Sequence, residues 1–499
     1  MTLTKKIGYN SSVQFLGRLG MVLLSLVLVT FLTRYLGVEK YGHYTTILAF
    51  VALFNLFAEF GINQIIVREV SQKPRNRAKI MGGGLILKIL ISVVVFAIPP
   101  IIAYFLPYPS DVKWGILICS IATCPITIAS LFVTIFQIHL KMHRYVIGSI
   151  AGRFLTLILS LLFIKTEKEL IYFFIAILAG NILELFLDFV LAAPLEKIKI
   201  VFDKKLYKKI FLESWPMAVA LGLGTVAFKV DTIILSLLKD QQAVGTYGVP
   251  YKVVDILITI PSIFMGLVLP VISRYVIKNK TKLNKSIQKS FDAMAVIGFY
   301  LFVVIALLAP FIINLIAGSG FAASTLPLRY LSLAICIIFL NAPLPYLLVA
   351  AGKQTQLIWR NLFSLIVNII LNLILIPYFS YNGAAVATIL AELMSAVFTF
   401  YLSWQLLKIL PSFKKVFGII IATILSFTVG FSLIKMNVFI SWQNFGNISF
   451  GYRALSFLAV FLIISFFYFL FLVLFKGIDR QILAQFIPIK IPLQDKNKK

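Results

Sequence analysis

Long apolar runs, each long enough to cross a membrane as a helix, follow one another along nearly the whole chain. A bilayer core about 30 Å thick requires about 20 residues of helix. Fourteen runs of that kind occur, at 12–33, 43–66, 80–103, 114–138, 145–164, 170–193, 215–238, 244–272, 289–316, 326–350, 354–376, 383–407, 416–435 and 452–475. The pattern predicts helices, because a membrane barrel would show alternating strands of about ten residues instead. We therefore expect an all-α polytopic membrane protein with about 14 transmembrane helices.

The composition supports this class. Of the 499 residues, 61% are hydrophobic and 13% are charged, whereas an average soluble domain carries about 25% charged residues. Soluble enzymes, secreted scaffolds and disordered proteins are excluded on this ground. The cysteines lie inside apolar runs and predict neither a disulfide framework nor a thiolate metal site; they are Cys119, Cys124 and Cys336.

Basic residues alternate between the segments that connect the spans. Of the 46 Lys and Arg residues, 31 lie in the terminal segments or in the loops after even-numbered spans, and 8 lie in the intervening loops. Cytoplasmic loops of membrane proteins collect Lys and Arg. This split predicts a multi-pass protein of the cell membrane with both termini in the cytoplasm. It also explains the net charge of +28, so no nucleic-acid partner is predicted.

Reporter fusions test this topology. Fusions at Lys204 and Lys282 are expected to read cytoplasmic, and fusions at Glu167 and Gln443 to read external, because of the positive-inside asymmetry. Alkaline phosphatase activity and green fluorescence, measured at each position, report the two sides. A reversed pattern would contradict the topology.

Weak internal similarity predicts two copies of a six-span unit. Residues 42–44 match residues 245–247 at an offset of 203, and Lys141 matches Lys353 at an offset of 212. At the second offset, Thr156 and Ser160 match Asn368 and Asn372. Both copies begin on the same side, and transporters often contain such repeats. We predict two pseudo-symmetric six-helix lobes, 1–193 and 215–409, a basic cytoplasmic linker, 194–214, two extra C-terminal helices, 410–475, and a basic cytoplasmic tail, 476–499.

Charged side chains also fall inside the spans, where each would cost on the order of 2.5–3.5 kcal/mol if it faced lipid. A water-filled interior is their natural location. The cations are Arg18, Lys88, Arg153, Lys229, Lys252, Arg329 and Arg360, and the acids are Glu59, Glu184, Asp188, Asp231, Asp255 and Glu392. Arg18, Arg360, Glu59 and Arg329 lie near span ends, so their side chains could instead reach the interface.

The deepest charges lie on the seventh and eighth spans. Lys252 and Asp255 are three residues apart, so they share a helix face and can neutralise each other. Lys229 and Asp231 point in different directions and need partners on other helices. We expect Lys229, Asp231 and Arg18 to face a central cavity between the two lobes. Asn368 and Asn372 share a face of the eleventh span, where they either hydrogen-bond between helices or line a path for sugar hydroxyls.

Two short motifs are typical in part of a metal site and of a nucleotide-binding loop, but both are incomplete. His139 and His143 share a helix face, but no acidic ligand stands beside them in the sequence, so no metal site is predicted. Gly82–Gly84 is not followed by the Gly-Lys-Ser/Thr sequence of a nucleotide-binding loop. No cofactor and no catalytic residue is predicted.

Three groups of motifs resemble the polysaccharide-biosynthesis flippases of the multidrug/oligosaccharidyl-lipid/polysaccharide exporter superfamily. They are Arg34–Gly37 with Tyr41–Tyr44 and Glu59–Ile62, then Asp231–Ile234 with Val244–Tyr247, and then Ile376–Tyr378 with Gly383–Thr388 and Glu392. The resemblance covers nearly the whole chain, although its motifs are loose. Glu59 departs from the pattern, since the family more often has Asp there, but the charge is kept.

The resemblance implies translocation of a polyprenyl-pyrophosphate-linked oligosaccharide from the cytoplasmic to the outer leaflet by alternating access, for export of cell-surface polysaccharide. Interior cations would stabilise the pyrophosphate where water is scarce. The expected partners are the lipid-linked oligosaccharide, membrane lipids, H+ or Na+ as coupling ion, and a polysaccharide polymerase with glycosyltransferases. The residues assigned to the pyrophosphate and glycan are Arg18, Lys229, Lys252, Arg153, Arg360, Asn368 and Asn372, and the coupling acids are Asp231, Asp255, Glu59 and Glu392.

Two alternatives stay open at this point. A cation-coupled multidrug or small-molecule antiporter of the same superfamily usually has twelve spans and an interior suited to cationic drugs. A membrane glycan polymerase or glycosyltransferase is disfavoured because no predicted outside loop is longer than about sixteen residues. No enzyme is predicted. The sugar repeat, the coupling ion and the oligomeric state are not readable from the sequence.

Overall fold

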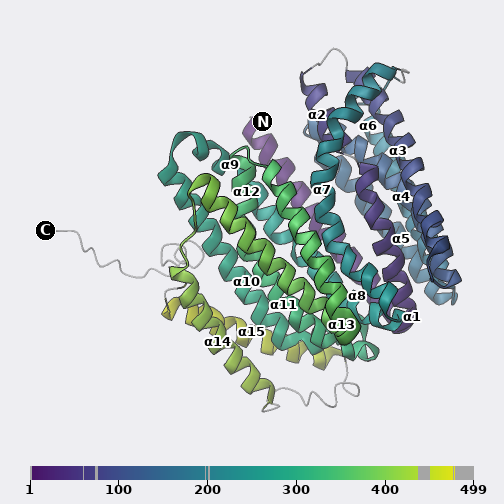
Figure 1. The fold of residues 1–499 in the computed structure, drawn as a ribbon. Coiled ribbons are helices and arrows are strands. Elements are labelled where there is room, and N and C mark those ends of the chain that lie inside the picture. The colour runs from purple at the N-terminus through teal and green to yellow at the C-terminus, as the bar shows by residue number, and fades with distance from the viewer. Residues whose placement is uncertain are drawn as a thin grey trace. The chain divides into compact units, whose positions relative to one another are not determined.

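The computed structural model describes residues 3–59, 61–72, 77–196, 198–199, 203–435, 450–475 and 477. All regular elements in these ranges are helices (Figure 1). They are α1 (Leu3–Glu59), α2 (Ile62–Gln72), α3 (Arg77–Phe105), α4 (Ser110–Ile138), α5 (Met142–Lys165), α6 (Leu170–Ala192), α7 (Lys204–Leu238), α8 (Gln241–Leu257), α9 (Thr259–Lys278), α10 (Lys280–Ala317), the 3-10 helix η2 (Ser319–Ser324), α11 (Thr325–Asn341), α12 (Pro343–Ala350), α13 (Thr355–Leu407), α14 (Lys414–Lys435) and α15 (Phe450–Leu474).

The helices confirm the predicted all-α polytopic fold. In the described chain, 11 segments are long and apolar enough to cross a membrane. Two of them, Ser12–Glu59 and Thr355–Leu407, have 48 and 53 residues and each contains two predicted spans, separated at Gly37 and Ser380, where the backbone leaves helical geometry. With α7 at the predicted span 215–238, all 14 predicted spans coincide with helix. The predicted external position Gln443 and nearly all of the predicted tail 476–499 lie outside the described residues.

One predicted boundary is wrong. The second span was expected to run to residue 66, but its helix ends at Glu59 and α2 begins separately at Ile62. Gly61 stands between them with φ +65, a left-handed conformation that glycine adopts without steric cost. Because the apolar run continues across the break, hydropathy alone did not locate it.

The chain packs as two compact units. The first comprises Met1–Ile256, Ile313–Pro327 and Thr355–Ser395, and the second Leu257–Ile312, Leu328–Gln354 and Ala396–Lys499. In the first unit, α4 lies against α3 and α6, and α5 lies against α6 and α1 (Figure 1). In the second, α14 packs on α15, and a core around Phe291, Ile419 and Tyr468 joins them to α10. The lobe boundaries 1–193 and 215–409 stay a prediction.

The turns at the two matched lysines share one backbone pattern. In the turn after α4, Leu140 has φ 53 and the Lys141 amide donates to the Phe136 carbonyl at 2.8 Å. In the turn after α12, Gly352 has φ 71 and the Lys353 amide donates to the Leu348 carbonyl at 2.8 Å. The turn after α5 has the same pattern, with φ 52 at Glu167 and a bond of 2.9 Å from the Lys168 amide to the Phe163 carbonyl, so the repeat stays a prediction.

A reciprocal contact joins the two matched glycines at the start of the repeat. A Cβ atom on Gly42 would overlap the Gln241 carbonyl oxygen, and one on Gly245 would overlap the Val38 carbonyl oxygen. Each glycine thus faces the residue four positions before the other, so the contact has a local two-fold character. Only glycine permits the second half of α1 and the start of α8 to approach this closely.

Candidate functional site

An ion pair between α7 and α8 lies at the centre of the predicted site. The Lys229 ammonium is 2.9 Å from Asp255 Oδ2, and it lies 4.7 Å from the centre of the Tyr251 ring. The side chains of Lys229 and Asp255 are 22% and 30% exposed, so the pair is only partly buried. Lys229 has the partner on another helix that the sequence predicted. Asp255 thus pairs with Lys229 and also interacts electrostatically with Lys252, as their shared helix face led us to expect.

Two further cations approach this pair. Lys252 interacts electrostatically with Asp255, Lys229 and Arg153, which brings α5 to the site. We call Arg153, Lys229, Lys252 and Asp255 the cationic cluster. The cluster carries three cations and one carboxylate, and like charges repel more strongly at low dielectric than in water. The cluster is therefore arranged to stabilise an added anion.

Asp231 belongs to a separate hydrogen-bond network. Its side chain is 1% exposed. Tyr247 Oη donates to Asp231 Oδ2 at 2.6 Å, Thr388 Oγ1 donates to the same oxygen at 3.3 Å, and the Thr232 amide donates to Oδ1 at 2.7 Å. The prediction that Asp231 needs partners on other helices is confirmed, since Tyr247 comes from α8 and Thr388 from α13. The Tyr247 and Thr388 roles were missed, although both residues stand in the motifs that carry the family resemblance.

Replacing Tyr247 by Phe tests this network. The substitution removes a buried hydrogen bond to a carboxylate, which is typically worth about 1.5–3 kcal/mol. We expect the purified variant to unfold at a lower temperature than the native protein. Thermal unfolding in detergent measures the difference. Tyr378→Phe is the matched control, because Tyr378 is 81% exposed, and an equal loss in both variants would contradict the role of the network.

Arg360 and Glu392 form a second charged pair in α13. They interact electrostatically, and Glu392 also interacts with Tyr251 beside the cationic cluster. Arg360 Nη1 donates to Asn361 Oδ1 at 2.9 Å. The assignment of Arg360 and Glu392 to one site with the cationic cluster stays a prediction.

Asn368 and Asn372 pair with each other. Asn372 Nδ2 donates to Asn368 Oδ1 at 2.7 Å, and both side chains are buried. This hydrogen bond lies within one helix, whereas the sequence left an interhelical bond or a sugar path as the alternatives. Asn372 Oδ1 is buried and has no hydrogen-bond partner among the described residues.

Arg18 and Glu59 are both exposed on α1. Among the described residues, no ion pair joins either side chain to the cationic cluster. Glu59 interacts electrostatically with Lys88 of α3. Lys88 is fully buried and donates to Asn63 Oδ1 at 2.9 Å and to Ser130.

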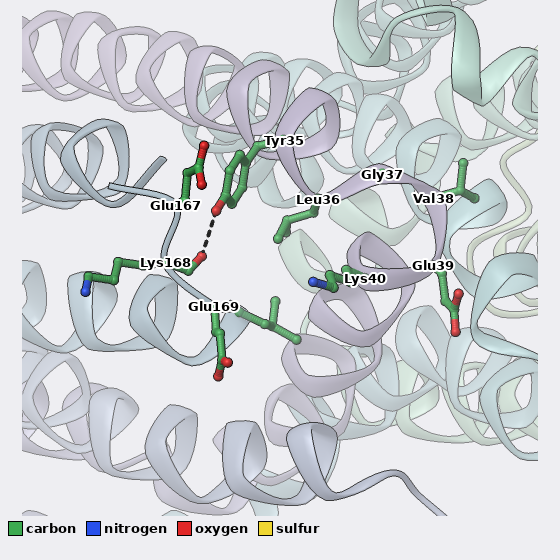
Figure 2. A pocket seen from close by; sticks show the side chains of 10 residues that line it. Tyr35, Leu36, Gly37, Val38, Glu39, Lys40, Glu167, Lys168 and Glu169 are labelled. Carbon is green, nitrogen blue, oxygen red and sulfur yellow. Dashed lines mark hydrogen bonds between the residues drawn. The ribbon is translucent and has the colours of Figure 1, made fainter. Parts of the chain in front are cut away.

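A pocket of about 570 Å³ lies between two connecting segments of the first unit. Figure 2 shows Tyr35 with its hydroxyl donating to the Lys168 carbonyl oxygen, at 3.0 Å, and the charged side chains around it. The lining residues run from Tyr35 to Lys40 and from Glu167 to Leu170. The site residues predicted from the sequence are absent from this lining. By the predicted topology, both segments face the outside.

The surroundings of the two histidines differ from the expectation in one respect. His139 Nε2 is 3.2 Å from Glu196 Oε2, so an acidic partner does stand near the histidines, though far along the sequence. Within the described ranges, no group of three or more His, Cys, Asp and Glu side chains is placed to hold a metal ion.

Comparison with known proteins gives two family matches. Residues 3–276 match the family described as polysaccharide biosynthesis protein, and residues 216–374 match the family described as MatE. No curated protein sequence matches the chain.

Several solved structures share the fold. Lipid II flippase MurJ in an inward closed conformation is 16% identical, with a TM-score of 0.72 over 93% of this chain and 99% of that chain. An inward-facing multidrug resistance MATE family transporter of the MOP superfamily is 14% identical, with a TM-score of 0.67 over 77% of this chain and 94% of that chain. A MOP superfamily transporter from Pyrococcus furiosus is 15% identical, with a TM-score of 0.52 over 80% and 93%. At these identities the likeness establishes the fold, which flippases and drug transporters share.

Proposed function

Since the chain belongs to the polysaccharide biosynthesis protein family, which residues 3–276 match, we propose that it is a flippase for a lipid-linked oligosaccharide. It moves a polyprenyl-pyrophosphate-linked repeat unit from the cytoplasmic to the outer leaflet, for export of cell-surface polysaccharide. The observation that supports this proposal is the cationic cluster, which carries three cations and one carboxylate.

The chemistry of the cargo fits this charge excess. A pyrophosphate is anionic, and charge-assisted hydrogen bonds from Lys and Arg are about twice as strong as neutral ones. Arg153, Lys229 and Lys252 are proposed to hold the pyrophosphate, with Arg360 and Arg18 supplying further positive charge along its path. Asn368 and Asn372 are proposed to contact the glycan. The support is that the side-chain oxygen Oδ1 of Asn372 has no hydrogen-bond partner among the described residues. The prenyl tail is proposed to stay in the lipid bilayer.

Alternating access of the two predicted six-helix lobes is the proposed mechanism, as repeat-built transporters use it. Asp231, Asp255, Glu59 and Glu392 are proposed to couple the movement to H+ or Na+. Substrate supply and product use require a glycosyltransferase on one side and a polysaccharide polymerase on the other. Neighbouring genes for such enzymes are the expected genomic context. The protein itself is proposed to move its substrate without altering any covalent bond.

A multidrug antiporter is the second candidate, because residues 216–374 match the MatE family. Such a protein would bind cationic compounds, which the cationic cluster would repel. Asp231 could attract them only if its hydrogen bonds to Tyr247 and Thr388 were broken. Charge therefore favours the anionic lipid.

Reconstitution into vesicles decides between the two candidates. A polyprenyl-pyrophosphate-linked glycan is placed in one leaflet, and its arrival in the other is read by periodate oxidation of the newly exposed sugar. Ethidium release from matched vesicles reports drug transport. Transfer of the lipid without ethidium release is expected. Ethidium release without lipid transfer would establish the antiporter instead.

A further inference from the structure

Two buried carboxyl groups on α6 lie outside the site described so far. Glu184 and Asp188 are four residues apart, so they share a helix face. Their residues are 5% and 0% exposed. They face α5 where it carries Gly148 and Gly152: a Cβ atom on Gly148 would overlap the Asp188 carboxyl, and one on Gly152 would lie 3.0 Å from Glu184 Cβ. The glycines leave room for these acids and for little else.

The partners of the two acids are few. Glu184 Oε1 accepts a hydrogen bond from the Ser149 hydroxyl. Both carboxyl oxygens of Asp188 are buried without any hydrogen-bond partner in the described part of the chain. Asp188 interacts electrostatically with Glu184, and Glu184 with Arg153. In the same described ranges, neither acid has a basic group within ion-pair distance. Arg144 of α5 donates to the Leu191 carbonyl of α6, three residues after Asp188.

Electrostatics limits the protonation states that such a pair of carboxyl groups can adopt. An ionised carboxylate without a partner in an apolar interior is too costly, so the group neutralises instead. Two neighbouring carboxylates also disfavour each other's ionised form. A metal cation would need a shell of several oxygen ligands, whereas Asp188 faces the bare backbone of Gly148. A proton, in contrast, neutralises the negative charge of the pair and needs no additional space.

We propose that Glu184 and Asp188 form a proton-binding site that takes up and releases one proton during the transport cycle. The proton comes from water and joins a carboxyl oxygen as O–H, and it returns to water when the pair ionises. Asp188 is four residues from the end of α6 at Ala192, on the side predicted to be cytoplasmic. Because Asp188 is fully buried, exchange requires α5 and α6 to move apart, which would link the proton to a conformational change.

The charged and titratable groups around the pair come from three helices. The helices α4, α5 and α1 pack against α6. Arg144 of α5 donates to the Leu191 carbonyl of α6, and Arg153 of α5 interacts electrostatically with Glu184. The same three helices also carry His143 of α5, Cys124 of α4 and Arg18 of α1. Arg153 interacts electrostatically with both Glu184 and Lys252, so it connects the proton site to the cationic cluster. An anion bound at the cluster would weaken the hold of Arg153 on Glu184 and favour proton uptake.

Infrared spectroscopy of the purified protein tests the site without any substrate. A protonated carboxyl group gives its own carbonyl stretching band, which shifts in D2O. We expect this band in the native protein at neutral pH, with loss of intensity as pH rises, and loss of the band in Asp188→Asn and Glu184→Gln. The control Glu39→Gln, at an exposed acid of α1, is expected to retain it. Ser149→Ala keeps both acids and is expected to shift the band, which covers the case that the first two variants fail to fold.

Three results would overturn the site. They are a spectrum unchanged by Asp188→Asn and Ser149→Ala, a band that stays constant at every pH, and thermal stabilisation by NaCl but not KCl that disappears in Asp188→Asn. The last would identify a sodium site instead.

The coupling part of the inference rests on the proposed function, and a second measurement addresses it. In vesicles, a pH gradient is expected to accelerate lipid transfer by the native protein and by Glu39→Gln, and this acceleration is expected to be smaller in Asp188→Asn at equal protein level. An undiminished response in Asp188→Asn would contradict coupling at this site. If the native protein transfers no lipid, the proposed function fails while the infrared result on proton binding still stands.

Discussion

Lys229→Glu is expected to abolish transfer of the lipid-linked glycan at normal protein level, whereas Lys229→Arg retains much of it. The reversed charge would repel the pyrophosphate and would also face Asp255, which lies 2.9 Å from the Lys229 ammonium in the native protein. Lys229→Gln keeps polarity and similar length but forfeits a charge-assisted contact of about 1.5–3 kcal/mol, or roughly ten- to hundredfold in affinity. Transfer between leaflets is measured beside the membrane level of each variant.

The ion pair with Asp255 demands a control, because Lys229 could act only by neutralising that carboxylate. Removing one partner of this partly buried pair leaves the other charge without its ion-pair partner. In the double variant Lys229→Gln with Asp255→Asn, neither charge remains. If Lys229 holds the pyrophosphate, the double variant stays as impaired as Lys229→Gln alone. Recovery of transport in the double variant would assign Lys229 a structural role.

Arg18→Gln provides a comparison with Lys229→Gln, because both residues are assigned to the pyrophosphate. Arg18 is exposed on α1, whereas Lys229 is paired with Asp255, so Arg18→Gln is expected to reduce transport less than Lys229→Gln. Full transport by both Arg18→Gln and Lys229→Glu would remove the idea that interior cations hold the cargo. The assignment to the family would survive that result.

The sequence predicted the helices well because membrane helices are specified by length and apolarity, which are local properties. It failed at Gly61, where the apolar run continues although the backbone turns. The predicted repeat stays a prediction, because the backbone pattern shared by the turns at Lys141 and Lys353 also occurs at Lys168.

The partners of the site charges were less accessible to sequence reasoning. Lys252 and Asp255 share a helix face, yet Lys229 takes the carboxylate from a neighbouring helix. Helix spacing describes neighbours along one helix only, while partners across helices depend on packing. The Tyr247 hydroxyl and the unpartnered Asp188 carboxyl depend on the same packing. A motif could flag these residues but not say what they contact.

Gly42→Val is expected to abolish transport by blocking the contact between α1 and α8. A Cβ atom at Gly42 would overlap the Gln241 backbone carbonyl, and a backbone atom cannot move aside as a flexible side chain does. Overpacking of this kind typically costs about 1–3 kcal/mol. Both segments lie at span ends that are predicted to face outside, so the variant should be unable to close its outer end.

Thiol labelling reports that closure. Thr45 lies against Gly248 in the same contact, so a cysteine placed at Thr45 is expected to be protected from an impermeant maleimide in the native background and labelled in the Gly42→Val background. Gly245→Val should behave like Gly42→Val, because the two glycines face each other's helix reciprocally. Gly266→Val is the matched control, since a Cβ atom there meets nothing within 4 Å, and it should transport normally. Normal transport by Gly42→Val would mean that this close approach is dispensable, and with it the outer closure that the two matched glycines make possible.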